Sequence, residues 1–384
     1  MIVIDALDEC GGLRHDSSAK DDYEDLLRTL KRWVQVDHLK KFKLVITSRP
    51  EDAITKMFPD SVSTHVNIPS GSEVKPEDSA SDDIRAFLKS RLNKMANESG
   101  LQDAWVMKAL NFLVPRAAGI FIWATTVAGF LEQNPEPRFG ILEEGWRGDN
   151  EEGFDDLYSL YSTVVRTSFE KVYKKEIEGI TSVMGAMIFS KEPLNDDALI
   201  VLPGVKSQNA LQLVRRGLVS VIDSGPILHF HHHSFEDFLL SPFFKQKLRT
   251  LSAVQDRDRH ERQLAVLCLN TMASSALHFN VCGLKTSDIR NRDIPAADKF
   301  ANSHLLSYSC QFWADHLVRT PCEQTLMEVV QFVMYEKLLF WMEVMSASGR
   351  VYEATLILKR ALAWPKLKAC CSLACHGTYL MLAG

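Results

Sequence analysis

The sequence predicts a small parallel α/β segment followed by mostly α-helical domains, so the chain is expected to be predominantly α overall. Two short apolar runs, residues 2–7 and 43–50, end in polar residues and flank one helical pattern, which is the order of a βαβ unit. After about residue 70, apolar residues recur at helical spacing instead. A length of 384 residues is enough for two or three domains.

The first expected domain covers residues 1–70. The two apolar runs have the composition of fully buried parallel strands, and residues 23–39 between them carry apolar side chains close to a helical period. A sheet of two strands leaves both edges open. Either residues 64–68 supply a further strand, or most of the sheet is expected to lie upstream of residue 1.

A small helical domain is expected at residues 71–150. A polar cluster at 70–81 ends in a helix-capping residue, and an amphipathic helix follows at 82–95. Two more helices are predicted within 101–131, separated at Val114-Pro115 because proline disrupts a helix interior. A segment rich in proline, glycine and acidic residues, 133–153, is predicted to be a loop at the domain boundary.

A winged-helix domain is expected at residues 151–245. Its helices are predicted at 177–189, 194–202 and 210–218, followed by two short strands at 218–225 and 226–231. Three apolar residues that follow a run of histidines recur at helical spacing and are expected in the core; they are Phe235, Phe238 and Leu239.

A second helical domain is expected at residues 246–384, with an atypical tail from about residue 366. Two apolar stripes at helical spacing are expected to pack helices together. The first comprises Leu306, Cys310, Trp313 and Leu317, and the second comprises Val330, Val333, Met334, Leu338, Trp341, Met342 and Met345.

Composition and charge exclude several classes of partner. Hydrophobic residues make up 46% of the chain and charged residues 24%, as in ordinary globular proteins. The net charge of −5 argues against a nucleic-acid partner. The eight cysteines lack the pattern of a secreted disulfide scaffold, and the first residues lack the basic region of a signal peptide. The longest uncharged run, 117–131, is shorter than a membrane span, so we expect a cytoplasmic protein without a membrane partner.

Six segments, in chain order, carry a resemblance to one family. They resemble the Walker B strand, the sensor 1 strand, a helical segment, the end of the winged helix and two parts of the helical domain of fungal, mushroom-type NACHT proteins, which are signal-transducing P-loop NTPases of the STAND class. The segments are IVIDALDEC (2–10), LVITSRPE (44–51), GIFIWA (119–124), HHSFEDFL (232–239), NVCGL (280–284) and YSCQFWADHL (308–317). The resemblance covers residues 1–363 and implies that the α/β segment is a remnant of a P-loop NTPase sheet.

The resemblance implies roles for three acidic residues after the first strand. Asp5 would hold Mg²⁺ through water, because this ion prefers hard oxygen ligands and keeps several waters. Asp8 and Glu9 would be the catalytic carboxylates that orient or deprotonate the attacking water. An apolar run that ends in an acid also occurs at many buried strands, where the acid only caps the strand.

The resemblance also implies two residues that contact the nucleotide. Arg49 would sense the γ-phosphate from the carboxyl end of its strand; a surface ion pair with position 51 or 52 is the alternative. His232 would contact the β-phosphate of ADP from the winged helix. Because His231 and His233 flank it, the register of this role is open by one residue.

One motif of the family is absent from the sequence. The chain contains no G-x-x-x-x-G-K-[ST] motif and no Gly-Lys pair, so it lacks the loop that cradles the β- and γ-phosphates. We expect a NACHT protein truncated before Walker B. Mg²⁺ and ATP or GTP would be the cofactors of the intact family, and this chain is expected to bind none of them tightly.

The predicted function is therefore a fragment of a nucleotide-controlled switch in fungal defence or regulated cell death, itself without catalytic activity. Its partners would be other proteins or further copies of itself, engaged through upstream or downstream domains. The alternative is a non-catalytic protein-interaction module, in which the NTPase remnant is vestigial.

Overall fold

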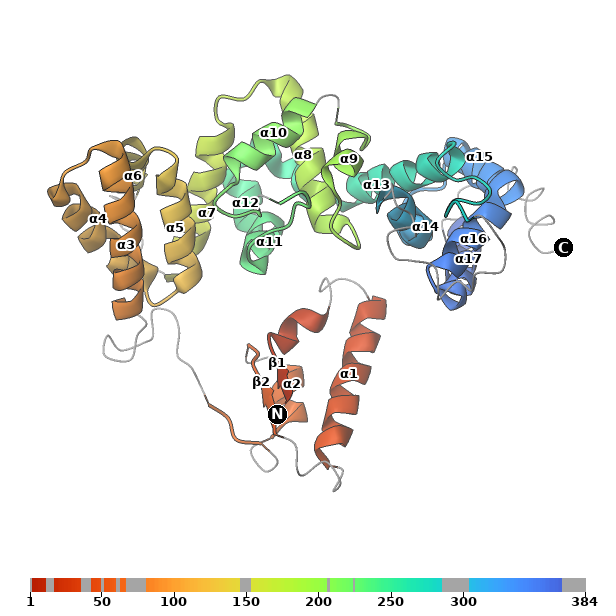
Figure 1. Cartoon of the computed structure of the whole chain (residues 1–384), viewed down its shortest axis with the longest axis horizontal. Coiled ribbons are helices and arrows are strands. Elements are labelled where there is room, and N and C mark those ends of the chain that lie inside the picture. Colours follow the sequence, from red (N-terminus) through yellow and green to blue (C-terminus); the bar gives the residue numbers. More distant parts are fainter. Residues whose placement is uncertain are drawn as a thin grey trace. The chain divides into compact units, whose positions relative to one another are not determined.

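The computed structural model describes residues 2–11, 17–35, 43–49, 52–59, 63–66, 81–145, 153–205, 208–223, 225–284 and 304–367. The chain divides into two compact units, Met1–Pro69 and Ser70–Gly384, which are described separately (Figure 1). Helices dominate the described residues, as the sequence predicted, and the sheet consists of two short strands. The division falls beside the first expected domain boundary, at residue 70.

The first unit contains the predicted parallel strand pair and the predicted helix between the strands, together with a second short helix that the sequence did not reveal. Strands β1 and β2 pair in parallel with Ile2 opposite Leu44 and Ile4 opposite Ile46. Ile4 and Ile46 lie on the face that packs against the helices, where the buried side chains are Leu7, Tyr23, Leu27, Leu30, Ile54 and Phe58. The elements are β1 (Ile2–Ile4), the 3₁₀ helix η1 (Leu7–Gly11), α1 (Ser17–Gln35), β2 (Leu44–Ile46) and α2 (Asp52–Met57).

The opposite face of this sheet is exposed. Side chains alternate along a strand, and Val3 and Val45 accordingly point away from Ile4 and Ile46, with exposed fractions of 56% and 44%. The further strand considered at 64–68 is not formed at 64–66, which have irregular backbone, and positions 67 and 68 lie outside the described residues.

Four helices begin the second unit, and two sequence predictions fail there. They are α3 (Ser81–Ser99), α4 (Asp103–Ala117), α5 (Phe121–Glu132) and α6 (Pro135–Gly145). The break predicted at Val114-Pro115 is wrong, because Pro115 lies inside the last turn of α4. The chain turns instead at Ala118 and Gly119, whose φ angles are 46° and 76°.

The loop predicted over 133–153 is also wrong, because α6 occupies its first half. Pro135 is the first residue of this helix, where a missing backbone N–H costs nothing. Phe139 and Leu142, three positions apart, are buried in the core of the unit. This core continues across the boundaries expected near residues 150 and 245.

Among its described residues, the next part of the second unit holds four helices, of which the sequence predicted three, and the segment predicted as a hairpin. The helices are α7 (Gly153–Phe169), which the sequence did not reveal, α8 (Lys174–Phe189), α9 (Asp196–Ile200) and α10 (Gln208–Gly217). The two predicted strands are reduced to an isolated antiparallel bridge between Ile222 and Phe230, and a second bridge joins Asn195 to Ile227.

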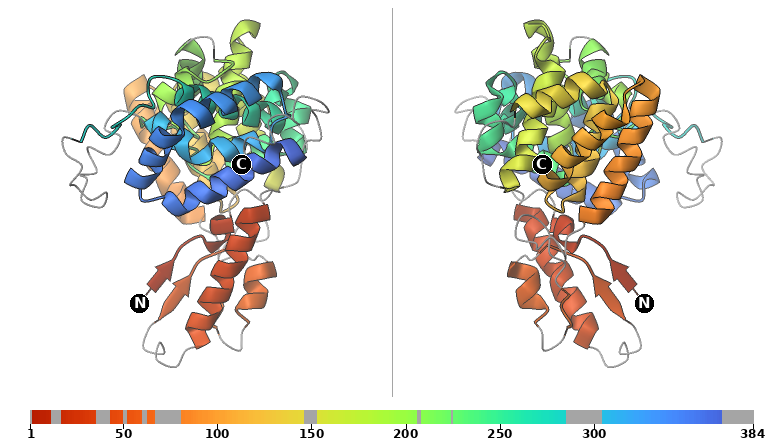
Figure 2. Two further views of the ribbon diagram at one scale, coloured as in Figure 1. Left: turned by 90° about the vertical axis from the view of Figure 1, so that its right-hand side faces the viewer. Right: turned by 90° about the vertical axis from the view of Figure 1, so that its left-hand side faces the viewer.

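The remainder of the unit is helical, as predicted from about residue 251. These helices are drawn in green to blue in Figure 1 and in Figure 2. They are α11 (His233–Leu240), α12 (Pro242–Lys247), η3 (Arg249–Gln255), α13 (Arg257–Ala273), α14 (His304–Leu317), α15 (Gln324–Phe332), the π-helical turn η5 (Val333–Lys337), α16 (Leu338–Ala347) and α17 (Val351–Leu367). The four residues of the first predicted stripe are buried.

Candidate functional site

The carboxyl ends of β1 and β2 bring polar residues from two parts of the first unit together. Because the strands are parallel, Asp5 after β1 and Thr47 after β2 reach the same edge of the sheet. The Thr47 hydroxyl donates a hydrogen bond to the Asp5 carboxylate and accepts one from the backbone N–H of Ala6 at 2.9 Å. Ala6 has a φ angle of 51°, a conformation that costs strain in a residue with a Cβ.

Asp8 is held by the segment that follows β2. Its Oδ1 atom accepts the backbone N–H of Arg49 at 3.1 Å and lies 3.2 Å from the Ser48 hydroxyl. Its Oδ2 atom lies 3.6 Å from Nε of Arg49, and the Asp8 side chain is only 8% exposed. The two strand ends are therefore joined by hydrogen bonds and by one ion pair.

The ion pair gives Arg49 a partner within the predicted site. Of the two alternative partners, Asp52 lies 3.5 Å from Lys56 within α2, and position 51 lies outside the described residues. The Arg49 side chain is 42% exposed, so its guanidinium reaches the surface beside the edge carboxylates.

Asp5, which was expected to hold Mg²⁺ through water, has few other side-chain ligands near it among the described residues. Asp5 is exposed, and the described residues contain no group of three or more His, Cys, Asp or Glu side chains that could hold a metal ion. One exposed carboxylate fits a magnesium ion that phosphate and water oxygens hold for the most part. Glu9 belongs to η1, but its side chain lies outside the described part of the chain.

His232 lies in the second unit, at the N-cap of α11. Its Nδ1 atom accepts the backbone N–H of Ser234 at 3.1 Å and lies 2.8 Å from the Ser234 hydroxyl. The Tyr161 hydroxyl lies 2.8 Å from the same hydroxyl. Because Nδ1 accepts, a neutral His232 carries its proton on Nε2, which can then donate to an anion.

The neighbouring histidines have different surroundings. The backbone N–H of His231 bonds to Val221 across the hairpin at 2.9 Å, and His231 is exposed. His233 is the first residue of α11, with Nε2 3.9 Å from Asp237. Of these three histidines, only His232 is the N-cap of α11. This difference favours His232 over its two neighbours for the expected phosphate contact.

Two buried groups near His232 escaped the sequence analysis. Burial, and secondly the charge of Asp237, raise the pKa of the Glu236 carboxyl to about 7, and burial raises the pKa of Tyr161 to about 12. A carboxyl in the first turn of a helix ordinarily favours its charged form, so Glu236 is unusual in being hard to ionise. The local sequence HHSFED gave no sign of this.

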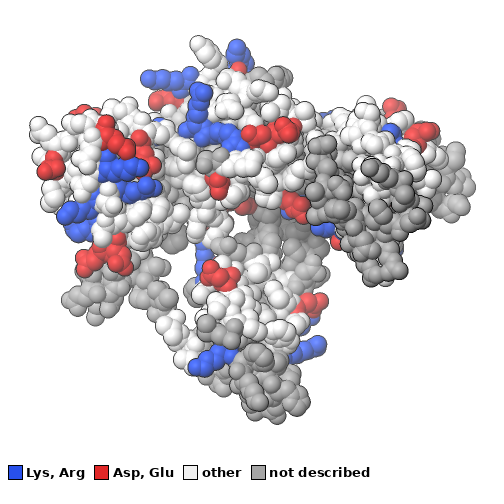
Figure 3. Space-filling model, in the orientation of Figure 1, with Lys and Arg blue, Asp and Glu red and all other residues white. Residues whose placement is uncertain are grey.

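The structure thus brings Asp5, Asp8 and Arg49 together in the first unit and places His232 in the second. Comparison of the chain with known protein families, with curated proteins and with solved structures finds no match. No helix among the described residues is long and apolar enough to cross a membrane. On the face shown in Figure 3, acidic and basic side chains of the described residues are interspersed.

Proposed function

We propose that this chain carries part of a nucleotide-controlled switch of the NACHT type, acting in fungal defence or regulated cell death, and that it does not hydrolyse nucleotide by itself. The observation that carries the proposal is the meeting of Asp5 and Asp8 with Thr47 and Arg49 at the carboxyl edge of a parallel sheet. Ligands of open α/β sheets bind at this edge.

The helices and hairpin of the second unit support the proposal. The Asn195–Ile227 bridge sets the segment before α9 beside the second arm of the hairpin, which is the strand order of a winged helix. His232 follows that arm and caps the next helix. A winged helix that presents an imidazole Nε2 donor suits contact with a diphosphate in the inactive state of such a switch.

The roles of the first-unit residues follow from their chemistry. Asp5 would hold Mg²⁺ through water, and the bound ion would neutralise phosphate charge. Asp8 or Glu9 would orient the attacking water where the full phosphate cradle exists, and Arg49 would detect the γ-phosphate. Since the sequence has no P-loop motif, we expect MgATP or MgGTP to bind this chain weakly.

A non-catalytic interaction module is the second candidate, and one observation favours it. Asp8 and Arg49 neutralise each other in the structure, and Asp5 is bonded to Thr47. A nucleotide would have to compete with these internal contacts for Arg49. If these contacts never open, the strand ends have a structural role only, and partner proteins bind elsewhere.

The two candidates are distinguished by nucleotide titration of the whole 384-residue chain, followed by amide NMR signals. The switch predicts a dissociation constant weaker than about 1 mM for MgATP, equivalent to about −4 kcal/mol or less favourable. It also predicts that signals of Thr47, Ser48 and Arg49 shift more with MgATP than with MgADP. Arg49→Ala should remove this difference. Arg28→Ala, which removes an exposed arginine of α1 paired with Glu24, should preserve it.

Two other results of the nucleotide titration would contradict parts of this proposal. If the signals of the strand ends do not respond to MgATP at about 10 mM, the interaction module replaces the switch. If micromolar binding is measured, the claim that the missing P-loop weakens affinity is wrong. Asp5→Ala should change little in this chain, because without the phosphate cradle a magnesium ion has few other ligands.

A further inference from the structure

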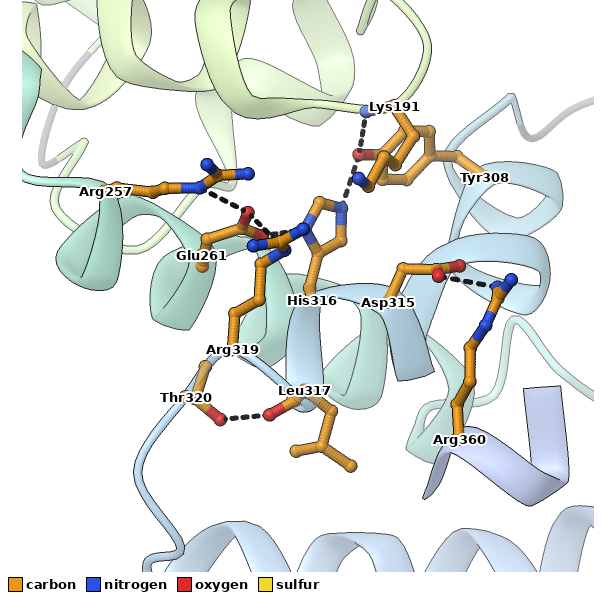
Figure 4. Close-up of polar contacts among 10 residues, drawn as sticks. All are labelled: Lys191, Arg257, Glu261, Tyr308, Asp315, His316, Leu317, Arg319, Thr320 and Arg360. Carbon is orange, nitrogen blue, oxygen red and sulfur yellow. Dashed lines mark hydrogen bonds and ion pairs between the residues drawn. The ribbon is translucent and has the colours of Figure 1, made fainter. Parts of the chain in front are cut away.

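A chain of buried hydrogen bonds joins three segments of the second unit (Figure 4). Glu261 of α13 and His316 of α14 are at most 1% exposed, and Nδ1 of His316 lies 2.6 Å from Oε2 of Glu261. Nε2 of His316 lies 2.7 Å from the Tyr308 hydroxyl. That hydroxyl accepts the backbone N–H of Lys191, in the turn after α8, at 3.1 Å.

The positions of the protons in this chain follow from its two ends. The Glu261 carboxylate can only accept, so Nδ1 of His316 carries the hydrogen between them. In a neutral imidazole Nε2 is then bare and accepts the phenol hydrogen of Tyr308, whose oxygen accepts the backbone N–H of Lys191. Burial raises the pKa of Tyr308 well above its usual value, so the phenol keeps its hydrogen.

The carboxylate at the end of the chain is neutralised on its other oxygen. Oε1 of Glu261 lies 3.4 Å from Nε of Arg257 and 3.4 Å from Nε of Arg319. Both arginine side chains are partly exposed, whereas the carboxylate is not. A buried charge that loses its partners is strongly destabilising, so Glu261 fixes how α13 and the end of α14 lie together.

The residue before Glu261 makes a second buried network on a neighbouring face of α13. The imidazole of His260 lies 2.8 Å from the Ala253 carbonyl and 3.0 Å from Oε1 of Gln263. The amide of Gln263 donates to Ser182 of α8 at 2.9 Å. Successive residues of α13 therefore connect this helix to α8 and to α14.

We propose that the Glu261–His316–Tyr308 chain is a latch that holds the turn at Lys191 in one register against α13 and α14. Apolar helix faces can slide past one another at small cost. A series of hydrogen bonds with one proton arrangement, in contrast, keeps all its donors and acceptors paired in only one relative position of the helices. Opening the latch releases the turn after α8 from α14, while the bond between Gln263 and Ser182 still joins α8 to α13. This inference does not depend on the proposed function.

Amide hydrogen exchange of the whole chain tests the latch through Tyr308→Phe, which removes one hydroxyl group. We expect exchange at Lys191 and in the turn after α8 to accelerate at least about tenfold, because a buried donor and a buried acceptor lose their partner. Exchange in α3 to α6 should not change. Tyr161→Phe is the matched control: it removes another buried hydroxyl of the same unit, bonded to Ser234, and should leave the Lys191 turn unchanged.

Three results would overturn the latch. These are unchanged exchange at Lys191 in Tyr308→Phe, an equal increase throughout the second unit, and failure of Tyr308→Phe to fold. The last two would show that the hydroxyl supports the whole core rather than one joint.

Glu261→Gln separates the hydrogen-bond chain from the charge at its end. The glutamine oxygen can still accept from Nδ1 of His316, so exchange at Lys191 should stay within about twofold of the original chain. If it rises as in Tyr308→Phe, the charge holds the joint and the latch as proposed is refuted. The nitrogen NMR signals of His316 should also show a protonated Nδ1 and a bare Nε2, and the reverse tautomer would contradict the proton arrangement.

Discussion

The two units differ most in how they cover their apolar surface. In the first unit, the sheet packs one face on six buried side chains and leaves Val3 and Val45 exposed on the other. In the second unit, a single core runs through the helices and includes four fully buried tryptophans, Trp123, Trp313, Trp341 and Trp364. Because apolar burial is the main favourable contribution to folding, the second unit is expected to be far more stable.

The units also differ in where they place charge. In the first unit, the Asp8–Arg49 pair lies at a strand end with the arginine side chain 42% exposed, and ion pairs that water reaches contribute about 0 to 1 kcal/mol. In the second unit, Glu261 is fully buried and has partners on both oxygens. Polar groups of the first unit can therefore exchange partners at small cost, whereas those of the second unit fix its arrangement.

The largest expected effect is in the core of the second unit. Phe238 is fully buried and packs against the rings of Tyr158, Tyr161, Phe235, Phe243 and Phe244. Phe238→Ala should lower the free energy of unfolding by about 3 to 5 kcal/mol, measured by chemical denaturation. Phe279→Ala, at a side chain 76% exposed, should cost less than about 0.5 kcal/mol. A cost below about 1 kcal/mol for Phe238 would show that α11 does not belong to this core.

A smaller change should disrupt the first unit alone. Leu27 of α1 is fully buried, whereas the adjacent Leu26 is 37% exposed. Leu27→Ala should cost about 2 to 4 kcal/mol and abolish exchange protection in β1 and α1, while protection in α13 is retained. Leu26→Ala should leave both units protected. If Leu27→Ala also exposes α13, the two units fold as one and the contrast drawn above fails.

The next effect is a gain of stability that depends on pH. The pKa of Glu236 is about 7 in the folded chain, against an ordinary 4.5, so the folded state holds this proton more tightly than the unfolded state. Its contribution is therefore favourable below about pH 4.5 and is lost as the pH rises to about 7. Glu236→Gln should raise the free energy of unfolding at pH 8 by on the order of 2 kcal/mol after allowance for solvent screening.

The control for this measurement is Glu328→Gln, at an exposed position of α15, which should change stability by less than about 0.5 kcal/mol at either pH. At pH 4, Glu236→Gln should also be nearly neutral, because the original carboxyl is protonated in both states. A loss of stability at pH 8 would mean that the charged form of Glu236 is favoured in the folded chain.

The smallest expected effect is on the exposed face of the sheet. Val45→Thr should change the free energy of unfolding by no more than about 0.5 kcal/mol, because Val45 is 44% exposed and the hydroxyl of the new threonine can reach water. Val183→Thr in α8, where the side chain is fully buried, should cost about 1 to 3 kcal/mol. Equal costs in thermal unfolding would show that the outer sheet face is covered in solution.

The sequence predicted those features that arise from local patterns. The apolar runs located β1 and β2, and their parallel pairing brings Asp5 and Thr47 to one edge. Composition was misleading at α6, where proline, glycine and acidic residues indicated a loop. The spacing of Phe139 and Leu142 was the helical signal, but two apolar residues in one turn are too few to identify a helix.

The features that the sequence could not predict depend on contacts between distant residues. The Asp8–Arg49 pair joins residues 41 positions apart, and either residue alone has the appearance of a surface charge. Glu261 and His316 lie 55 positions apart, each within an otherwise ordinary amphipathic helix. Nothing in their neighbourhood indicates that a glutamate of α13 is buried, because two of its partners, His316 and Arg319, come from the end of α14 and the turn after it.

The close approach of α8 and α13 at Gly185 constrains how this sequence can diverge. A Cβ atom at position 185 would lie 2.2 Å from Cε1 of His260, so no side chain fits there while the imidazole is present. Replacement of the glycine becomes tolerable only after His260 has been exchanged for a smaller residue, which in turn breaks its bonds to Ala253 and Gln263. The two positions form an epistatic pair, and descendants of this chain should not change Gly185 unless His260 has already changed.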